Sequence, residues 1–125
     1  MLTTVAYVLA GLIGAGIIAI GTQELWMPRA SAGFGIPDSP VEDRTFQAWL
    51  SVKAVRDIAS GVFIFILLAA ATPDLLGWFM LAAAGIPLGD ALIVVRSNGP
   101  KAAAYGIHGA TAAVMVVISV LLLAA

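Results

Sequence analysis

The stretch LLGWFMLAAAGIPLGDALIVV, residues 75–95, decides the fold class, because Asp90 is its only charged residue. A transmembrane helix needs roughly 20 largely apolar residues, so a segment of this length and composition predicts a membrane span. Residues 2–21 contain no charged side chain, and residues 102–125 are interrupted only by His108. These two segments predict two further spans.

A fourth apolar segment, residues 46–71, differs from the others because its first half contains Lys53, Arg56 and Asp57. Its purely apolar second half, residues 58–71, is too short to cross a membrane alone. We therefore expect the charged half of this segment to enter the membrane as well.

The connections predict how the four spans are arranged. The loop of residues 22–45 contains three prolines and cannot form one regular helix. The turns at residues 72–74 and 97–100 are short and rich in turn-forming residues, so the second, third and fourth spans should run antiparallel as neighbours. The predicted fold is an all-α, integral membrane four-helix bundle that forms a single domain over residues 1–125.

The composition agrees with a lipid environment and excludes several kinds of chemistry. The chain is 62% hydrophobic and 10% charged, and its mean hydropathy is +1.06, so the lipid bilayer is an expected partner. The net charge of −1 and the lack of a basic patch argue against nucleic acid as a partner. The chain has no cysteine, which excludes disulfides, thiol redox chemistry and Cys-based metal sites.

The basic residues near the ends of the spans predict the orientation of the protein in the cell membrane. Cytoplasmic loops carry an excess of Lys and Arg. We therefore expect a multi-pass protein with loops 22–45 and 97–101 in the cytoplasm and both termini outside. Glu24, at the boundary of the first loop, fits an interfacial position. The cations that lie beside these two loops are Arg29, Arg44, Arg96 and Lys101.

Ionisable side chains from three spans are predicted to meet at one level. On the second span, a spacing of i, i+3, i+4 and i+7 puts four polar side chains on one helix face. Counting from the two tight turns places Asp57, Asp90 and His108 level with one another, about 9 Å below the loop surface at 1.5 Å per residue. The four residues on the second span are Lys53, Arg56, Asp57 and Ser60.

The third and fourth spans add features to this layer. Tyr105 and Thr111 stand three residues before and after His108, so we expect all three on one face of the fourth span. Pro87 lies three residues before Asp90 and is predicted to kink the third span, because proline cannot complete the helical hydrogen bond.

Structural interpretations compete with a functional one. Lys53 fits a side chain that extends to the headgroups, and His108 alone fits a hydrogen-bonded core histidine. An ion pair of Arg56 and Asp57 with Asp90 would fix helix packing without any chemistry. The functional interpretation rests on five ionisable residues at one level, since intramembrane charges are costly and a packing pair needs only two.

Several segments resemble those of a small bacterial and fungal family of four-helix membrane proteins, which is classified as a domain of unknown function and is loosely similar to DoxX-like proteins. Some fungal members accompany polyketide pathways in which epoxides are opened by small membrane hydrolases. The resemblance implies that Arg56, Asp57, Asp90 and His108 are the functional residues. The segments are residues 52–61 (VKAVRDIASG), 86–90 (IPLGD), 105–111 (YGIHGAT) and 32–35 (AGFG).

The residues predict a membrane-embedded acid–base enzyme that acts on a lipophilic small molecule, with epoxide hydrolysis as the reaction. Asp57 would deprotonate a water molecule, and Asp90 would protonate the epoxide oxygen, although the sequence alone equally allows the reverse assignment. Arg56 would hold the two carboxylates, in an Asp-Arg-Asp set like that of soluble limonene-type epoxide hydrolases, and His108 would orient them. The predicted substrate-binding residues are Lys53, Ser60, Tyr105 and Thr111.

Other functions stay open beside this prediction. A membrane isomerase or cyclase could use the same residues, and so could a non-catalytic binding, transport or accessory protein. We expect no cofactor, and no metal, because Lys53 and Arg56 would repel a cation at the carboxylates. A homo-oligomer is a further open alternative.

Overall fold

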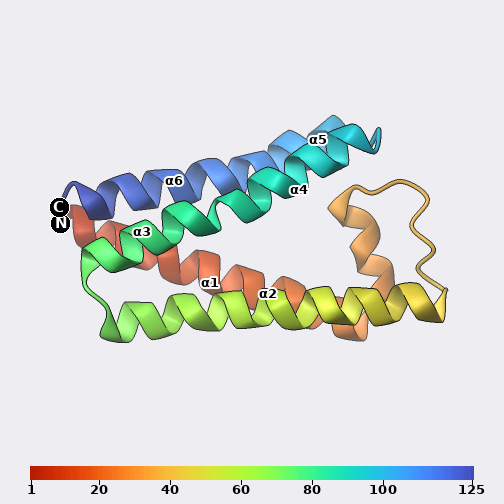
Figure 1. Cartoon of the computed structure of the whole chain (residues 1–125), viewed down its shortest axis with the longest axis horizontal. Coiled ribbons are helices and arrows are strands. Elements are labelled where there is room, and N and C mark those ends of the chain that lie inside the picture. The colour runs from red at the N-terminus through yellow and green to blue at the C-terminus, as the bar shows by residue number, and fades with distance from the viewer.

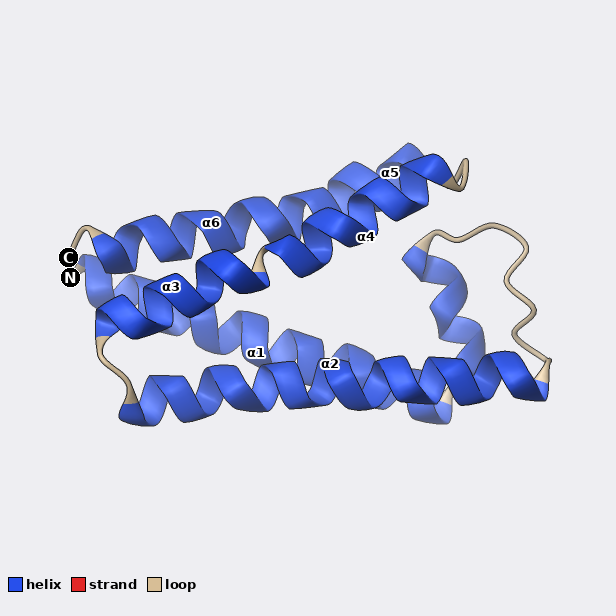
Figure 2. Cartoon of the chain, in the orientation of Figure 1, coloured by secondary structure: helices blue, strands red, loops and turns tan.

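The computed structural model describes residues 1–125, and every regular element in it is a helix (Figures 1 and 2). Elements α3 and α4 continue one another as a helix over Pro73–Arg96, and α5, η2 and α6 do so over Lys101–Leu123. The elements in chain order are α1 (Leu2–Trp26), the 3-10 helix η1 (Pro28–Phe34), α2 (Arg44–Ala70), α3 (Pro73–Ala83), α4 (Gly85–Arg96), α5 (Lys101–Ala103), the π-helix η2 (Ala104–Gly109) and α6 (Ala110–Leu123).

The predicted all-α class is confirmed, and three helices are long and apolar enough to cross a membrane: Leu2–Trp26, Pro73–Arg96 and Lys101–Leu123. Helix α2 has sufficient length, but its first half carries four charged side chains, Arg44, Lys53, Arg56 and Asp57, and these distinguish it from the three apolar helices. The lipid bilayer is therefore the natural surrounding of most of this chain.

The helix ends differ from the predicted ones where capping residues take effect. Helix α1 continues five residues beyond the predicted end at Gly21, because the first helix breaker is Pro28. Helix α2 begins at Arg44, since the carboxylate of Asp43 accepts a hydrogen bond from the Phe46 N–H at 2.7 Å. The predicted loop of residues 22–45 is therefore helical at both of its ends.

Helices α1 and α2 pack closely through glycines. Gly14 and Gly21 are buried on α1, and Gly61 is buried on α2. A Cβ atom at Gly61 would lie 2.5 Å from the carbonyl oxygen of Gly14 and 2.5 Å from Cγ1 of Ile18. Small residues at such a crossing let two backbones approach each other, which stabilises helix pairs in lipid.

Gly61→Ala is expected to lower the free energy of unfolding by about 1–3 kcal/mol, because the added methyl group overlaps the α1 backbone. The measurement is thermal unfolding of the purified protein in detergent. Gly16→Ala is the matched control, since a Cβ at Gly16 meets no atom within 4 Å. Equal stability of the two variants would contradict this packing.

The bundle is tightest at the end that holds both termini. Helices α1 and α2 form one pair, α3–α4 and α6 form a second, and the two pairs spread apart toward the opposite end (Figure 1). The main core lies near the termini and contains Ile64, Leu76, Met80, Met115, Ile118 and Leu122.

At the open end, the first loop returns between the two pairs. We call residues 28–36, which comprise η1, Gly35 and Ile36, the strap. Phe34 and Ile36 pack against a small cluster of Val94, Ala103 and Ala104 at the end of the second pair. Gly35 has a φ of 109°, and a Cβ there would lie 2.9 Å from that of Ala103, so glycine is required at this contact.

The strap also carries an ion pair on the protein surface. Nε of Arg29 donates a hydrogen bond to Oε1 of Glu42 at 2.6 Å, and both side chains are exposed. The hydrogen bond and the charge of Glu42 raise the pKa of Arg29 above its ordinary value. Because solvent surrounds this pair, it contributes little to stability.

The predicted interruption of the third span is present, slightly before the proline. Helix α3 ends at Ala83 and α4 begins at Gly85. Pro87 lies in the first turn of α4 and has no N–H to donate to the carbonyl of Ala83. The break at Ala84 therefore lies six residues before Asp90, toward the end of the bundle that holds the termini.

Candidate functional site

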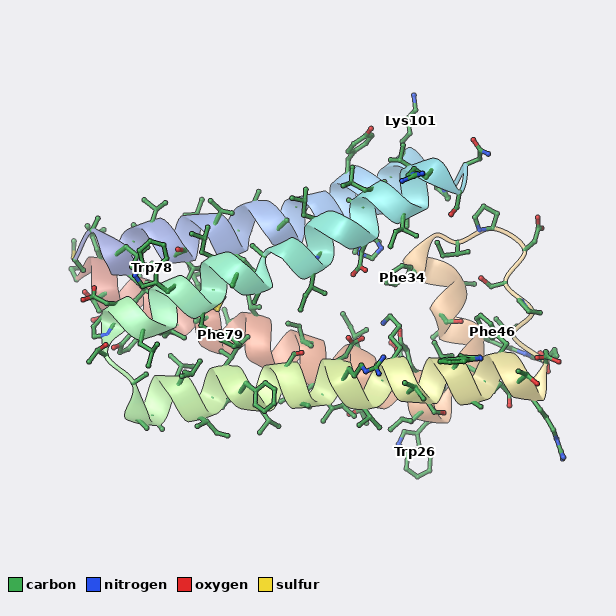
Figure 3. All side chains as sticks on the ribbon, in the orientation of Figure 1. Trp26, Phe34, Phe46, Trp78, Phe79 and Lys101 are labelled. Atoms are coloured by element: carbon green, nitrogen blue, oxygen red, sulfur yellow. The ribbon has the colours of Figure 1, made fainter.

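A cavity of about 390 Å³ lies between the two helix pairs, and its wall is mostly apolar. Residues from α1, the strap, α2, α3, α4, η2 and α6 all line it. In Figure 3, Phe34 and Phe79 point into the bundle, whereas Trp26 and Trp78 point outward. Six of the eight predicted site residues line this cavity: Lys53, Asp57, Ser60, Asp90, His108 and Thr111.

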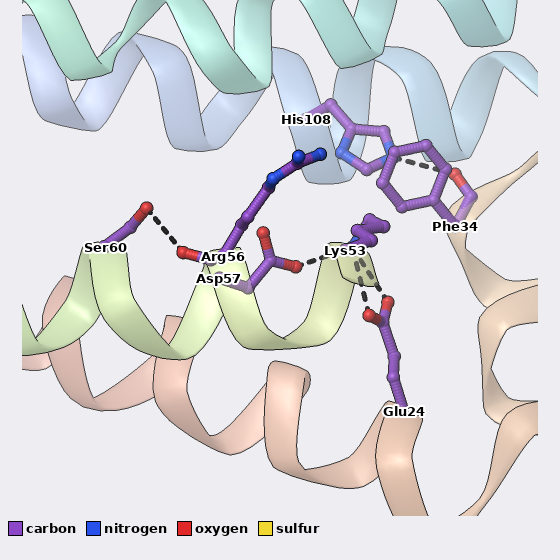
Figure 4. A network of polar contacts seen from close by, with 7 residues as sticks. All are labelled: Glu24, Phe34, Lys53, Arg56, Asp57, Ser60 and His108. Atoms are coloured by element: carbon purple, nitrogen blue, oxygen red, sulfur yellow. Dashed lines mark hydrogen bonds and ion pairs between the residues drawn. The ribbon is translucent and has the colours of Figure 1, made fainter. Parts of the chain in front are cut away.

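Lys53 is the centre of a partly buried ionic network (Figure 4). Its Nζ lies 2.6 Å from Oδ2 of Asp57, one helical turn away on α2. The same Nζ lies 2.9 Å and 3.2 Å from the two carboxylate oxygens of Glu24 on α1. Lys53 therefore turns inward to two carboxylates and does not extend to the headgroups.

Glu24, which the sequence places at the boundary of the first loop, is only 5% exposed and lies inside the bundle against Lys53. Helix α1 continues past Gly21, and this continuation brings Glu24 to the face that packs on α2. The signal was present in the sequence: Gly14, Gly21 and Glu24 follow the helical spacing of one buried face.

The predicted role of Arg56 as the holder of two carboxylates does not agree with the structure. Arg56 is exposed, makes no ion pair and does not line the cavity. The cation at Asp57 is Lys53, which stands four residues earlier on the same helix. The spacing put both cations on one broad face of α2. The way α2 packs on α1 turns Lys53, and not Arg56, toward the carboxylates of Glu24 and Asp57.

His108 is held by the strap. Its Nε2 lies 2.7 Å from the carbonyl oxygen of Phe34, and the two rings are 4.3 Å apart. Because a carbonyl oxygen can only accept, Nε2 carries the proton and donates it. In the neutral imidazole, Nδ1 then has a free lone pair. The buried His108 is thus a fixed group with one nitrogen left for a ligand or a proton.

Phe34 joins the basic and imidazole side chains of the site. Nζ of Lys53 lies 4.9 Å from the centre of the Phe34 ring, within the range of a cation–π interaction. Phe34 is not among the predicted site residues, although it belongs to the AGFG segment at residues 32–35 that carries the family resemblance. One strap residue thus contacts both Lys53 and His108.

The expectation that Tyr105 shares a face with His108 and Thr111 is wrong. Residues 104–109 form a π-helix, in which the turn is wider than in an α-helix, so residues three apart no longer align. Tyr105 is 61% exposed, whereas His108 is 8% exposed. Single π-turns occur frequently at functional sites, and this one directs His108 into the cavity wall.

Asp90 is the carboxylate without a partner. It lines the cavity and makes no hydrogen bond or ion pair with another protein group. Two carboxylates from α2 and α4 therefore face one cavity in different states, one bound to a cation and the other free.

The two hydroxyl groups at the site donate to their own helices. Oγ of Ser60 donates to the Arg56 carbonyl at 2.8 Å, and Oγ1 of Thr111 donates to the Ile107 carbonyl at 2.7 Å. In this arrangement each hydroxyl offers the cavity an acceptor and no donor. The structure contains no group of three or more Asp, Glu or His side chains arranged to hold a metal ion.

Comparison with known proteins gives a family without an activity. A family model described as a domain of unknown function (DUF4267) matches residues 14–122. No curated protein and no solved structure is significantly similar to the chain. The likeness to DoxX-like proteins stays a prediction.

Proposed function

We propose a function for this chain from the residues that line its cavity. The chain belongs to the DUF4267 family, and the description of that family assigns no activity. The function is acid–base catalysis on a lipophilic small molecule within the membrane, and the reaction is the hydrolysis of an epoxide. The observation that carries this proposal is the pair of carboxylates on one mostly apolar cavity, Asp57 with a cation partner and Asp90 with none.

Asp57 is the proposed base. Its Oδ2 is held by the ion pair with Lys53, and its Oδ1 makes no contact with another protein group. Its Oδ1 can accept a proton from a water molecule in the cavity. Lys53 therefore holds the Asp57 carboxylate in place, a role that was predicted for Arg56.

Asp90 is the proposed acid. It makes no ion pair and lines a mostly apolar cavity, and a carboxyl group in such surroundings is a suitable proton donor. His108, fixed by the Phe34 carbonyl, presents Nδ1 as an acceptor that orients a water molecule or the acid.

The proposed step is balanced in protons and electrons. Asp57 takes a proton from water as the water oxygen attacks one epoxide carbon. The carbon–oxygen bond of the ring breaks, and Asp90 gives its proton to the oxygen that leaves. The product is a diol, and a water molecule returns the proton from Asp57 to Asp90.

The experiment that tests this function uses purified protein in lipid nanodiscs with racemic lipophilic epoxides in isotopically labelled water. Diol that contains one labelled oxygen supports hydrolysis. An isomerised or cyclised product without labelled oxygen supports the isomerase or cyclase alternative. Tight binding of several epoxides with no turnover would favour a binding or transport protein and overturn the enzyme.

We also propose that α2 is a fourth span and that the termini lie outside the cell. Both termini lie at one end of the bundle, as an even number of crossings requires (Figure 1). Of the charges on α2, Lys53 and Asp57 line the cavity and pair with each other, and Lys53 also pairs with Glu24 of α1. Their cost in the membrane is thereby reduced.

The natural absence of cysteine makes the proposed topology directly measurable. Ala32→Cys, Asp74→Cys and Ala125→Cys place single thiols on the strap, on the α2–α3 turn and at the C-terminus. An impermeant maleimide added to intact cells is expected to label Asp74→Cys and Ala125→Cys, and to label Ala32→Cys only after permeabilisation. Labelling of Asp74→Cys together with Ala32→Cys would mean that α2 does not cross.

A further inference from the structure

The cavity changes from polar to apolar along its length. On α2, Lys53 and Asp57 are followed by Phe63 and Ile64 toward the end that holds the termini. On the antiparallel α3–α4 helix, Ala83 stands seven residues before Asp90, just as Ile64 stands seven residues after Asp57 on α2. The ionisable groups therefore gather at one end of the cavity, and the other end is hydrocarbon-like.

The length of the apolar part follows from the helix rise. Seven residues separate Ala83 from Asp90 and Met115 from His108, and both pairs line the cavity. At 1.5 Å per residue, the apolar part extends for about 10 Å. A linear chain on the order of ten carbons has a comparable length.

The strap closes the polar end. Phe34 lines the cavity there and contacts both Lys53 and His108. Ile36 and Gly35 hold the strap on the second helix pair. A bulky substrate therefore has no direct route to the carboxylates from the loop side.

The side of the cavity between α2 and α4 is less enclosed. Both helices contribute lining residues, yet they do not pack closely against each other. Phe63 on α2 and Ile86 on α4 line the cavity and are also 52% and 55% exposed. These two apolar side chains mark an opening that faces lipid rather than water.

We infer that the substrate of the proposed enzyme is an amphiphile with one polar reactive end and one apolar tail of about ten carbons, which enters from the bilayer between α2 and α4. Its polar end lies toward the strap and its tail toward the termini. This inference rests on the proposed function for its reaction, and on the polarity gradient for the orientation of the ligand.

The bilayer origin of the substrate has a consequence for recognition. An apolar tail gains little free energy when it leaves lipid for a cavity of similar polarity. The polar end must therefore supply the affinity, and the tail sets an upper limit on length. A primary alkyl amide is a suitable unreactive probe, since its N–H donates to Asp57 and its carbonyl accepts from a protonated Asp90.

The experiment maps the probe with single cysteines. Thr111→Cys reports the polar end, Ala83→Cys reports the apolar end, and Gly16→Cys is a control away from the cavity. Each variant in nanodiscs is treated with a small permeant maleimide, with and without a long-chain amide of about ten carbons or a short-chain one of about four. Ala82→Cys serves as a second apolar reporter if Ala83→Cys does not fold.

The long amide is expected to slow labelling of Thr111→Cys and Ala83→Cys about tenfold at ten times its Kd. The short amide is expected to protect Thr111→Cys alone, and neither should protect Gly16→Cys. Equal protection of Ala83→Cys by both amides, or protection of Ala83→Cys by the long amide without Thr111→Cys, would overturn the inference. Length-dependent protection without epoxide turnover keeps the ligand class and overturns the reaction. Epoxide turnover without length-dependent protection keeps the reaction and overturns the ligand class.

Discussion

Asp90→Asn is expected to lower epoxide turnover by at least about 100-fold, the usual contribution of a positioned general acid. The amide has nearly the volume of the carboxyl group but cannot transfer a proton to the alkoxide. Asp90 makes no ion pair, so its replacement breaks no salt bridge and should leave the unfolding temperature within a few degrees of the parent. The measurement is diol formation at saturating epoxide, together with thermal unfolding of the same sample.

Two further variants sharpen this prediction. Asp57→Asn should lose turnover to a similar degree, since it removes the base, while Lys53 keeps Glu24 as its partner. Asp74→Asn is the matched control, because Asp74 lies in the first turn of α3 and does not line the cavity. Parent-like turnover by Asp90→Asn, with a normal unfolding temperature, would exclude it as the acid.

Lys53→Met is expected to lower the free energy of unfolding by about 3 kcal/mol, the lower end of the cost of breaking a buried ion pair. The substitution leaves the carboxylates of Glu24 and Asp57 without their cation. We choose the lower end because the Lys53 side chain is still 34% exposed, so solvent screens part of the interaction. Unfolding in detergent with a chemical denaturant measures the difference.

A second substitution tests the cause of that loss. Glu24→Gln combined with Lys53→Met removes the more deeply buried charge together with its partner and should restore at least about half of the lost stability. A double variant that is less stable than Lys53→Met would show that Lys53 acts through its packing and not through its charge.

The sequence was sufficient for the helical class and for the residues of the cavity layer. Helices rise by a constant amount per residue, and short turns fix the relative level of their neighbours. Counting from the turns therefore placed Asp57, Asp90 and His108 together, and the structure brings all three to one cavity. This part of the site depends on chain length and turns alone.

The hydrogen-bond and ion-pair partners of these residues depend on how each helix is rotated about its axis and on whether a turn is α, 3-10 or π. Residue spacing in the sequence does not determine either property. Lys53 and Arg56 are three residues apart on α2, but Lys53 pairs with Glu24 and Asp57 and lines the cavity, whereas Arg56 is exposed and pairs with neither carboxylate. Tyr105 was misplaced because the π-helix shifts its direction relative to His108. Phe34 was not among the predicted site residues because it lies on a short 3-10 helix within a long connection, and spacing alone does not show that this helix returns to the cavity.

The two helix pairs spread apart around the cavity, so the site is close to the surrounding lipid. The pairs are joined by core packing near the termini and by the strap at the opposite end, and little packing resists a change in the separation of α2 from α4. We therefore expect the separation of α2 from α4 to respond to the lateral pressure of the surrounding acyl chains. For the proposed lipophilic substrate, membrane thickness and lipid unsaturation would then affect occupancy of the cavity, as ionic strength affects a charged ligand in water.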